Sequence, residues 1–115
     1  MIHKIKTVNL KSDRPTVQAA LERLDRELAV AREQRGGVLK VIHGYGSTGV
    51  GGEIRIAIQK RLRELTDSGE ISGCIFGENW SKGDDESWRI LQTSAELKGD
   101  PDLGRRNPGI TIVIL

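Results

Sequence analysis

The sequence predicts one α/β domain, a two-layer sandwich in which a mixed four-stranded sheet packs against two main helices. Two long segments repeat apolar residues every three or four positions, which is the period of a helix with one buried face. Four short segments rich in β-branched residues complete the order β-α-β-α-β-β. At 115 residues, the chain is long enough to bury a core without disulfides or metals. We therefore expect residues 1–115 to form a single domain.

The first strand and the first helix are predicted within the first third of the chain. Residues 7–10 (TVNL) follow a polar tail at 1–6 and form a short strand, which the segment 11–15 ends. Thr16 is a residue type that caps helix N-termini, so a helix begins after it. The apolar residues of this helix share one face: Val17, Ala20, Leu21, Leu24, Leu28 and Ala31. Two glycines at 36–37 end the helix.

The middle of the chain predicts a strand, a turn, a second helix and a third strand. The strand Val38–Ile42 (VLKVI) leads into a glycine-rich turn at 43–52, and a helix begins near Gly52 or Glu53. Its inward residues are Ile54, Ala57, Ile58, Leu62 and Leu65. The segment 67–69 stops this helix, and residues 71–76 form the third strand, in which Cys74 is expected to be a small core residue.

The last third of the chain is predicted to be a long polar connection, 77–108, and a final strand, 110–115. Within the connection, 86–97 predicts a short helix with Trp88, Leu91 and Leu97 facing inward. We expect the tryptophans at 80 and 88 to cover the sheet edge, with stacking on an exposed base as the alternative.

The connections between the strands predict the strand directions. Right-handed β-α-β crossovers make the first three strands parallel. The last strand lacks a full crossover helix, so we expect it to lie antiparallel beside one of them.

Composition narrows the class of protein. One cysteine cannot form an internal disulfide, and residues 1–10 lack the apolar region of a signal peptide, so a cytoplasmic protein is expected. The longest apolar run, 110–115, is too short to cross a membrane. The net charge of +2 is too small to indicate a nucleic-acid partner by itself. We expect a monomer or a weak homo-oligomer.

The residues that commonly hold metals are too scattered to predict a metal site. Two histidines and one cysteine lie far apart in the sequence, so they supply no zinc ligand set. The acidic run Asp84, Asp85 and Glu86 is typical of a solvated helix start, with Mg²⁺ binding as the alternative.

The turn at 43–52 (HGYGSTGVGG) is the sharpest chemical feature, with five glycines in ten residues. Between a strand and a helix, glycines let backbone N–H groups turn toward one point, and the helix N-terminus adds positive potential. A phosphate is the natural occupant. A tight turn that only needs positive φ is the structural alternative.

Two nucleotide-binding motifs can be compared with this turn. Val50 stands where a Walker A loop has lysine. The pattern G-x-G-x-x-G does occur at 44–49, and Glu78 follows the next strand, where a ribose-binding acid would lie. A small protein that binds a nucleotide or phosphometabolite is therefore an alternative function, and a protein-interaction domain with an unoccupied loop is another.

Four segments resemble the small MutS-related (Smr) domain family in its short stand-alone bacterial form. They are VLKVIHGYGSTGVGGEIR at 38–55, TVQAALERLDREL at 16–28, DLGRRN at 102–107 and GITIVIL at 109–115. The resemblance spans 7–115 and matches least at 11–15 and 77–100. It implies a β-α-β-α-β-β sandwich that binds DNA or RNA, often structured or branched, and that nicks it in some members.

The resemblance and the predicted topology together give a set of candidate phosphate-binding residues. The resemblance implies His43, Gly44, Gly46, Thr48 and Gly49 as phosphate or backbone contacts, with Arg55 as a supporting cation. Loops after parallel strands share the carboxyl edge of the sheet, where open α/β sheets bind ligands. The topology thus adds Lys11, Arg14, Ser47, Arg105 and Arg106. His43 is the one catalytic candidate, as a general acid or base, and its alternative role is an orienting hydrogen bond within the turn.

The second signature of the family, Leu-Asp-x-His at the end of the first strand, reads Val8-Asn9-Leu10-Lys11 here. Both the acid and the imidazole are missing. We therefore predict nucleic-acid binding with weak or absent nicking endonuclease activity. No cofactor is expected, and Mg²⁺ would be needed only if the chain cleaves nucleic acid.

Overall fold

The computed structural model describes residues 5–13, 15–34, 37–44 and 50–115. Its elements are β1 (Ile5–Asn9), α1 (Val17–Glu33), β2 (Val38–Ile42), α2 (Val50–Asp67), β3 (Gly73–Phe76), η1 (Gly77–Asn79), α3 (Asp85–Thr93), η2 (Ala95–Gly99) and β4 (Ile110–Ile114). The predicted order of strands and main helices is confirmed. The first strand begins at Ile5, inside the segment expected to be a tail.

The four strands form one sheet in the order β1-β2-β4-β3. β1 pairs parallel to β2, whereas β4 pairs antiparallel to both β2 and β3. The first three strands thus run in one direction and the last in the other, as predicted. The position of β4 differs from the expectation in one respect. It lies between β2 and β3, whereas we expected it beside only one strand. Four of its five residues are buried, which suits a central strand covered on both faces.

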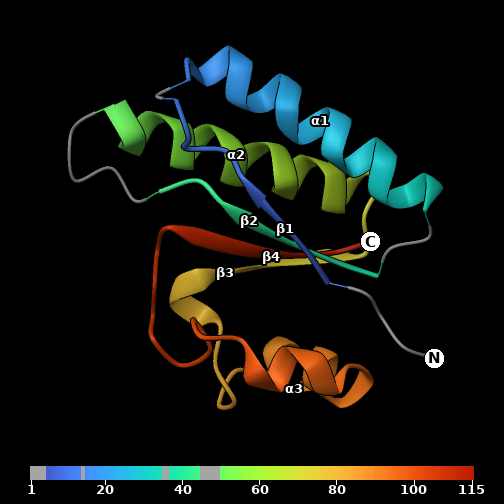
Figure 1. Cartoon of the computed structure of the whole chain (residues 1–115). Helices are drawn as coiled ribbons and strands as arrows, with labels where there is room; N and C mark the ends of the chain where they lie inside the picture. The colour runs from blue at the N-terminus through green and yellow to red at the C-terminus, as the bar shows by residue number, and fades with distance from the viewer. Residues whose placement is uncertain (1–4, 14, 35–36, 45–49) are drawn as a thin grey trace.

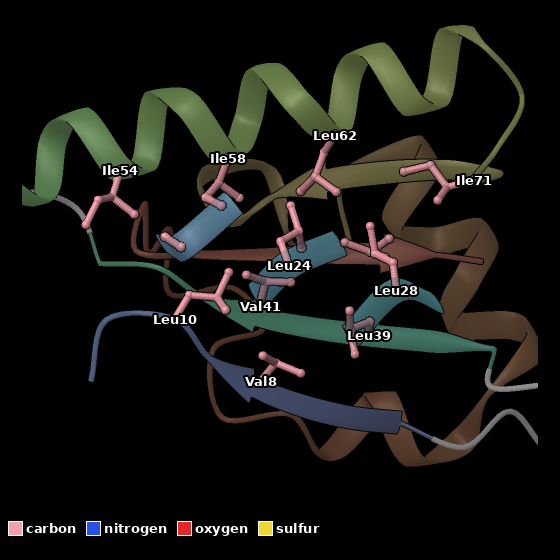
Figure 2. Packing of buried hydrophobic residues seen from close by; sticks show 12 residues of the cluster. Val8, Leu10, Leu24, Leu28, Leu39, Val41, Ile54, Ile58, Leu62 and Ile71 are labelled. Carbon is pink, nitrogen blue, oxygen red and sulfur yellow. The ribbon is translucent and has the colours of Figure 1, made fainter. Parts of the chain in front are cut away.

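α1 and α2 cover one face of the sheet (Figure 1). Thr16 caps α1 as expected, because its Oγ1 accepts a hydrogen bond from the N–H of Ala19 at 3.1 Å. The apolar stripes of both helices meet Val8, Leu39 and Val41 of the sheet in a continuous apolar cluster (Figure 2). Each fully buried aliphatic side chain in such a cluster contributes about 1.5–3 kcal/mol. No helix within the described ranges is both long and apolar enough to cross a membrane.

The connection between β3 and β4 covers the opposite face, so the sheet lies between two layers (Figure 1). α3 and η2 bring Ile90, Leu91 and Leu97 against Val38 and Ile75. The expected two-layer sandwich therefore gains a third layer. Its apolar residues are few and irregularly spaced, so the connection resembled a polar loop in the sequence.

The two tryptophans have different environments. Trp80 is fully buried against the sheet. This agrees with the expectation that it covers the sheet, and it leaves the indole unable to stack on an exposed base. Trp88, predicted to face inward, is 51% exposed, so that prediction is wrong. The buried face of α3 is set by Ser87, Ile90 and Leu91, and Ser87 Oγ accepts a hydrogen bond from the N–H of Ser81 at 3.3 Å. Trp88 lies outside this buried face.

Candidate functional site

The carboxyl ends of β1 and β2 bring Lys11 beside the start of the glycine turn. The N–H of Leu10 donates to the carbonyl oxygen of Ile42 at 2.7 Å, which extends the parallel pairing beyond β1. A Cβ built on Gly44 would lie 3.7 Å from Lys11 Cδ, so the lysine stem runs alongside this glycine. Two of the predicted residues therefore lie together at this edge. Arg14, Gly46, Ser47, Thr48 and Gly49 lie outside the described residues.

Gly44 has a left-handed backbone conformation, with φ of 79°. An L side chain is strained there, so glycine is required where the chain leaves β2. The N–H groups of His43 and Gly44 both donate to the carbonyl oxygen of Gly109, each at 3.0 Å. The residue that precedes β4 thus holds the first two residues of the turn in place.

His43 is 1% exposed, and both of its ring nitrogens have partners. Nδ1–H donates to the Gly44 carbonyl oxygen at 2.8 Å, and Nε2 accepts from Thr111 Oγ1 at 2.9 Å. A carbonyl can only accept, so these contacts assign the proton of the neutral ring to Nδ1. Burial lowers the His43 pKa below 6.5, and the positive charge of Arg55 adds to this against the opposing Gly44 hydrogen bond. The geometry favours the orienting role, while the catalytic role stays a prediction.

Arg55, on the second turn of α2, lies at the same edge. Its Nη1 is 3.8 Å from Oε2 of Glu78, which belongs to η1 directly after β3. The sequence suggested both residues, but for two different functions, a phosphate-binding cation and a ribose-binding acid. Their pairing was not anticipated, because they are joined only through the packing of α2 beside β3.

Asn9 organises the loop after β1. Its Oδ1 accepts hydrogen bonds from the N–H groups of Lys11 at 2.9 Å and Ser12 at 3.2 Å. A short polar side chain that bonds to the backbone two residues ahead forms an Asx turn. An aspartate carboxylate could accept the same two hydrogen bonds. Asn9 therefore organises the loop as an aspartate would, but without the negative charge.

On the face of the sheet opposite α1 and α2, a buried lysine attaches the connection between β3 and β4 to the sheet. Lys40, in β2, is 6% exposed, and its Nζ donates to Asp100 Oδ1 at 2.7 Å and Asp102 Oδ2 at 2.6 Å. Burial alone would lower the Lys40 pKa, but the two carboxylates outweigh it and raise the pKa above 10.5. Trp80 Nε1 donates to Asp100 Oδ2 at 3.0 Å, which ties the buried indole to the same group.

The lysine contacts continue to the glycine turn. Asn107 Nδ2 donates to Asp102 Oδ1 at 3.0 Å, and Asn107 Oδ1 accepts from the N–H of Gly109 at 2.8 Å. Gly109 in turn accepts from His43 and Gly44, as described above. The sequence analysis did not predict these contacts between Lys40, the connection and the glycine turn. The lysine in the middle of an apolar strand was the signal that could have indicated them, since a buried ammonium needs counter-charges.

The fold built in this way is similar to that of a known domain. The solved structure of the Smr domain of Thermus thermophilus MutS2 matches with a TM-score of 0.59 and 24% sequence identity, over 96% of this chain and 96% of that one. In its fold, the chain is an Smr-like domain. No family model matches the sequence, and no curated protein matches it significantly. At this identity the likeness establishes the fold alone.

The other two predicted cations of the Smr-like domain belong to the connection between β3 and β4. Arg105 and Arg106 are exposed in the turns at 101–106. Among the described contacts, no hydrogen bond or ion pair links them to Lys11, His43 or Arg55. Arg105 contributes to the low pKa of Asp102, for which the Asn107 hydrogen bond is the largest cause. Their phosphate contacts remain a prediction.

Metal-ligating groups are not gathered in the described part of this Smr-like domain. Within those ranges no three His, Cys, Asp or Glu side chains form a cluster that could hold an ion. The acidic run at 84–86 begins α3, where Asp84 Oδ2 accepts from the N–H of Ser87 at 2.9 Å and from its Oγ at 2.8 Å. Asp84 is thus a helix cap.

Proposed function

We propose that this Smr-like domain binds the phosphodiester backbone of DNA or RNA at the carboxyl edge of its sheet. The observation that carries the proposal is the approach of Lys11 to Gly44, at the point where β2 leads toward α2. Backbone N–H groups at the start of a long helix attract anions, and α2 has 18 residues. Arg55 adds a second positive charge close to His43.

The distribution of cations favours a polymer over a single nucleotide. Lys11 follows β1, Arg55 belongs to α2, and Arg105 and Arg106 belong to the connection. Cations from separate elements suit successive phosphates of one strand. A mononucleotide site would also need a pocket for the base. One groove among the described residues lies along β3, between Arg63, Phe76 and Glu86.

The same residues support binding without efficient cleavage. Phosphodiester hydrolysis needs a group that activates water and a group that protonates the leaving oxygen. The Asn9 amide cannot act as a base, and its oxygen already accepts two backbone hydrogen bonds. His43 is buried and bonded through both nitrogens. We therefore propose a binding module with weak or absent nicking activity.

Fluorescence anisotropy with labelled duplex, single-stranded and branched DNA and RNA tests binding. The logarithm of the association constant should fall against the logarithm of salt with a slope on the order of −3 to −5. Arg55→Ala should weaken binding and reduce the slope by about 1. Arg61→Ala is the matched control, since Arg61 lies on the same helix but pairs with Asp25 of α1 at 2.7 Å.

Three outcomes separate the candidate functions. Undetectable binding at low salt, or equal effects of Arg55→Ala and Arg61→Ala, contradicts the proposal. Saturable binding of a mononucleotide without polymer binding favours the small-ligand alternative. Binding of neither class leaves the protein-interaction alternative.

A nicking assay on supercoiled plasmid, with and without Mg²⁺, tests the chemistry. Wild-type protein should nick poorly, and the double change Asn9→Asp with Lys11→His should raise nicking even though the loss of the Lys11 charge weakens binding. Vigorous nicking by wild type that is lost in His43→Ala would contradict a binding module.

A further inference from the structure

The contact between Arg55 and Glu78 is loose on both sides. The Nη1–Oε2 distance of 3.8 Å is within range of an ion pair but too long for a hydrogen bond. Arg55 Nε is buried and, among the described residues, has no hydrogen-bond partner. A guanidinium presents five N–H donors, so this pair leaves most of the hydrogen-bonding capacity of Arg55 unused. Among the described residues, the arginine is therefore held at the edge by this one ion pair.

Glu78 opposes anion binding at the place where Arg55 favours it. Both side chains are partly exposed, at 30% for Arg55 and 41% for Glu78, so a ligand can reach them. A phosphate that binds the unused donors of the guanidinium lies beside the Glu78 carboxylate, because both anions then face the same cation. The two negative groups repel each other. A ligand that also brings a hydrogen-bond donor to the carboxylate can offset this repulsion.

In RNA, a hydrogen-bond donor lies next to every backbone phosphate. The ribose 2′-hydroxyl is on the carbon adjacent to the one that carries the 3′-phosphate, whereas DNA has hydrogen there. Building on the proposed function, we propose that Glu78 is a specificity-determining residue. It holds Arg55 in the free protein, and it accepts a hydrogen bond from the 2′-hydroxyl when Arg55 takes the neighbouring phosphate. The edge therefore selects ribose-containing strands.

The test measures the ratio of affinities for RNA and DNA strands of the same sequence and length. Wild type should bind the RNA more tightly. Glu78→Gln removes the repulsion but keeps the side-chain shape, so DNA affinity should rise on the order of 3-fold to 5-fold. RNA affinity should change less, because the lost charge-assisted hydrogen bond offsets the relief. The RNA-to-DNA ratio should therefore fall.

Two further variants make the test specific. Glu64→Gln changes the net charge equally on an exposed residue toward the other end of α2, and it should leave the ratio unchanged. In an Arg55→Ala background, Glu78→Gln should have a smaller effect on DNA affinity, because there is no ion pair to release. Thermal unfolding of each variant checks that the fold is retained.

The results that overturn this inference differ from those that overturn the proposed function. A wild-type preference for DNA, an unchanged ratio in Glu78→Gln, or an equal response to Glu64→Gln removes the role of Glu78. If Arg55→Ala still weakens binding in those cases, the edge remains a phosphate-binding site. If Arg55→Ala has no effect, the proposed function itself fails.

Discussion

The two faces of the sheet are covered in different ways, and β2 contributes to both. Toward α1 and α2 it presents Leu39 and Val41, which join an apolar cluster formed by two long amphipathic helices (Figure 2). Toward α3 it presents Val38 and Lys40, and the lysine binds two carboxylates of the connection. One layer is therefore held mainly by apolar burial, with ion pairs only on its more exposed side. The other adds a small number of charged and polar contacts to a smaller apolar cluster.

The glycine turn depends on both faces. His43 bonds to Thr111 Oγ1, whereas the backbone of the turn bonds to Gly109, which Asn107 connects to the lysine contacts. Gly77 allows this close approach, since a Cβ there would collide with the Asn107 carbonyl oxygen. The comparison indicates that damage to the α3 layer should reach the candidate site even though that layer covers the opposite face.

The largest expected effect is on the buried indole of the α3 layer. Trp80→Ala removes a fully buried aromatic side chain and its hydrogen bond to Asp100, so the free energy of unfolding should fall by about 3–5 kcal/mol. Trp88→Ala is the matched control, and it should change stability by no more than about 0.5 kcal/mol. Urea unfolding of both variants measures this. Similar losses would mean that α3 is rotated differently.

Lys40→Met tests whether charge holds the α3 layer. The change leaves Asp100 and Asp102 without their cation in a largely buried place, which should destabilise the fold by about 3 kcal/mol. Lys6→Met, which breaks the more exposed pair with Glu27, should cost less than about 1 kcal/mol. An equally stable Lys40→Met protein would show that apolar contacts suffice on both faces.

Acid should weaken the α3 layer through Asp102. The Asn107 hydrogen bond first, and then Lys40, lower the pKa of this carboxyl below its ordinary value of 3.8. Because the folded state favours the ionised form, the stabilisation is present above about pH 4 and is lost as the pH falls through the lowered pKa. Asp102→Asn should flatten the fall of stability below pH 4, measured by unfolding across pH. Asn107→Ala should act in the same direction, and an unchanged acid profile in both variants would contradict this assignment.

The smallest effect is expected where an ion pair joins the two helices of the apolar layer. Arg61 Nη1 contacts both oxygens of Asp25, at 2.9 and 2.7 Å, on the exposed side of α1 and α2. A double-mutant cycle of Asp25→Ala and Arg61→Ala should give a coupling of about 0.2–1 kcal/mol. A coupling comparable to the loss in Lys40→Met would mean that the apolar layer also depends on charge.

The sequence by itself determined the features that repeat over short distances. The helical period of α1 and α2, the Thr16 cap, the β-branched strands and the antiparallel direction of β4 are all local patterns or follow from connection type. The glycine turn also identified the edge at which Lys11 and Gly44 meet. These predictions succeeded because each depends on neighbouring residues or on the handedness of a crossover.

The tertiary structure decided the contacts between distant parts of the chain. Lys40 meets Asp100 across 60 residues and His43 meets Thr111 across 68, so no local period reports them. The insertion of β4 between β2 and β3 creates both contacts, since it brings the end of the connection against β2. The exposure of Trp88 depends on which side chains of α3 are buried, and the pairing of Arg55 with Glu78 depends on the packing of α2 beside β3. A side chain's partners depend on which elements pack together, and packing is settled by the burial and charge balance of the whole molecule.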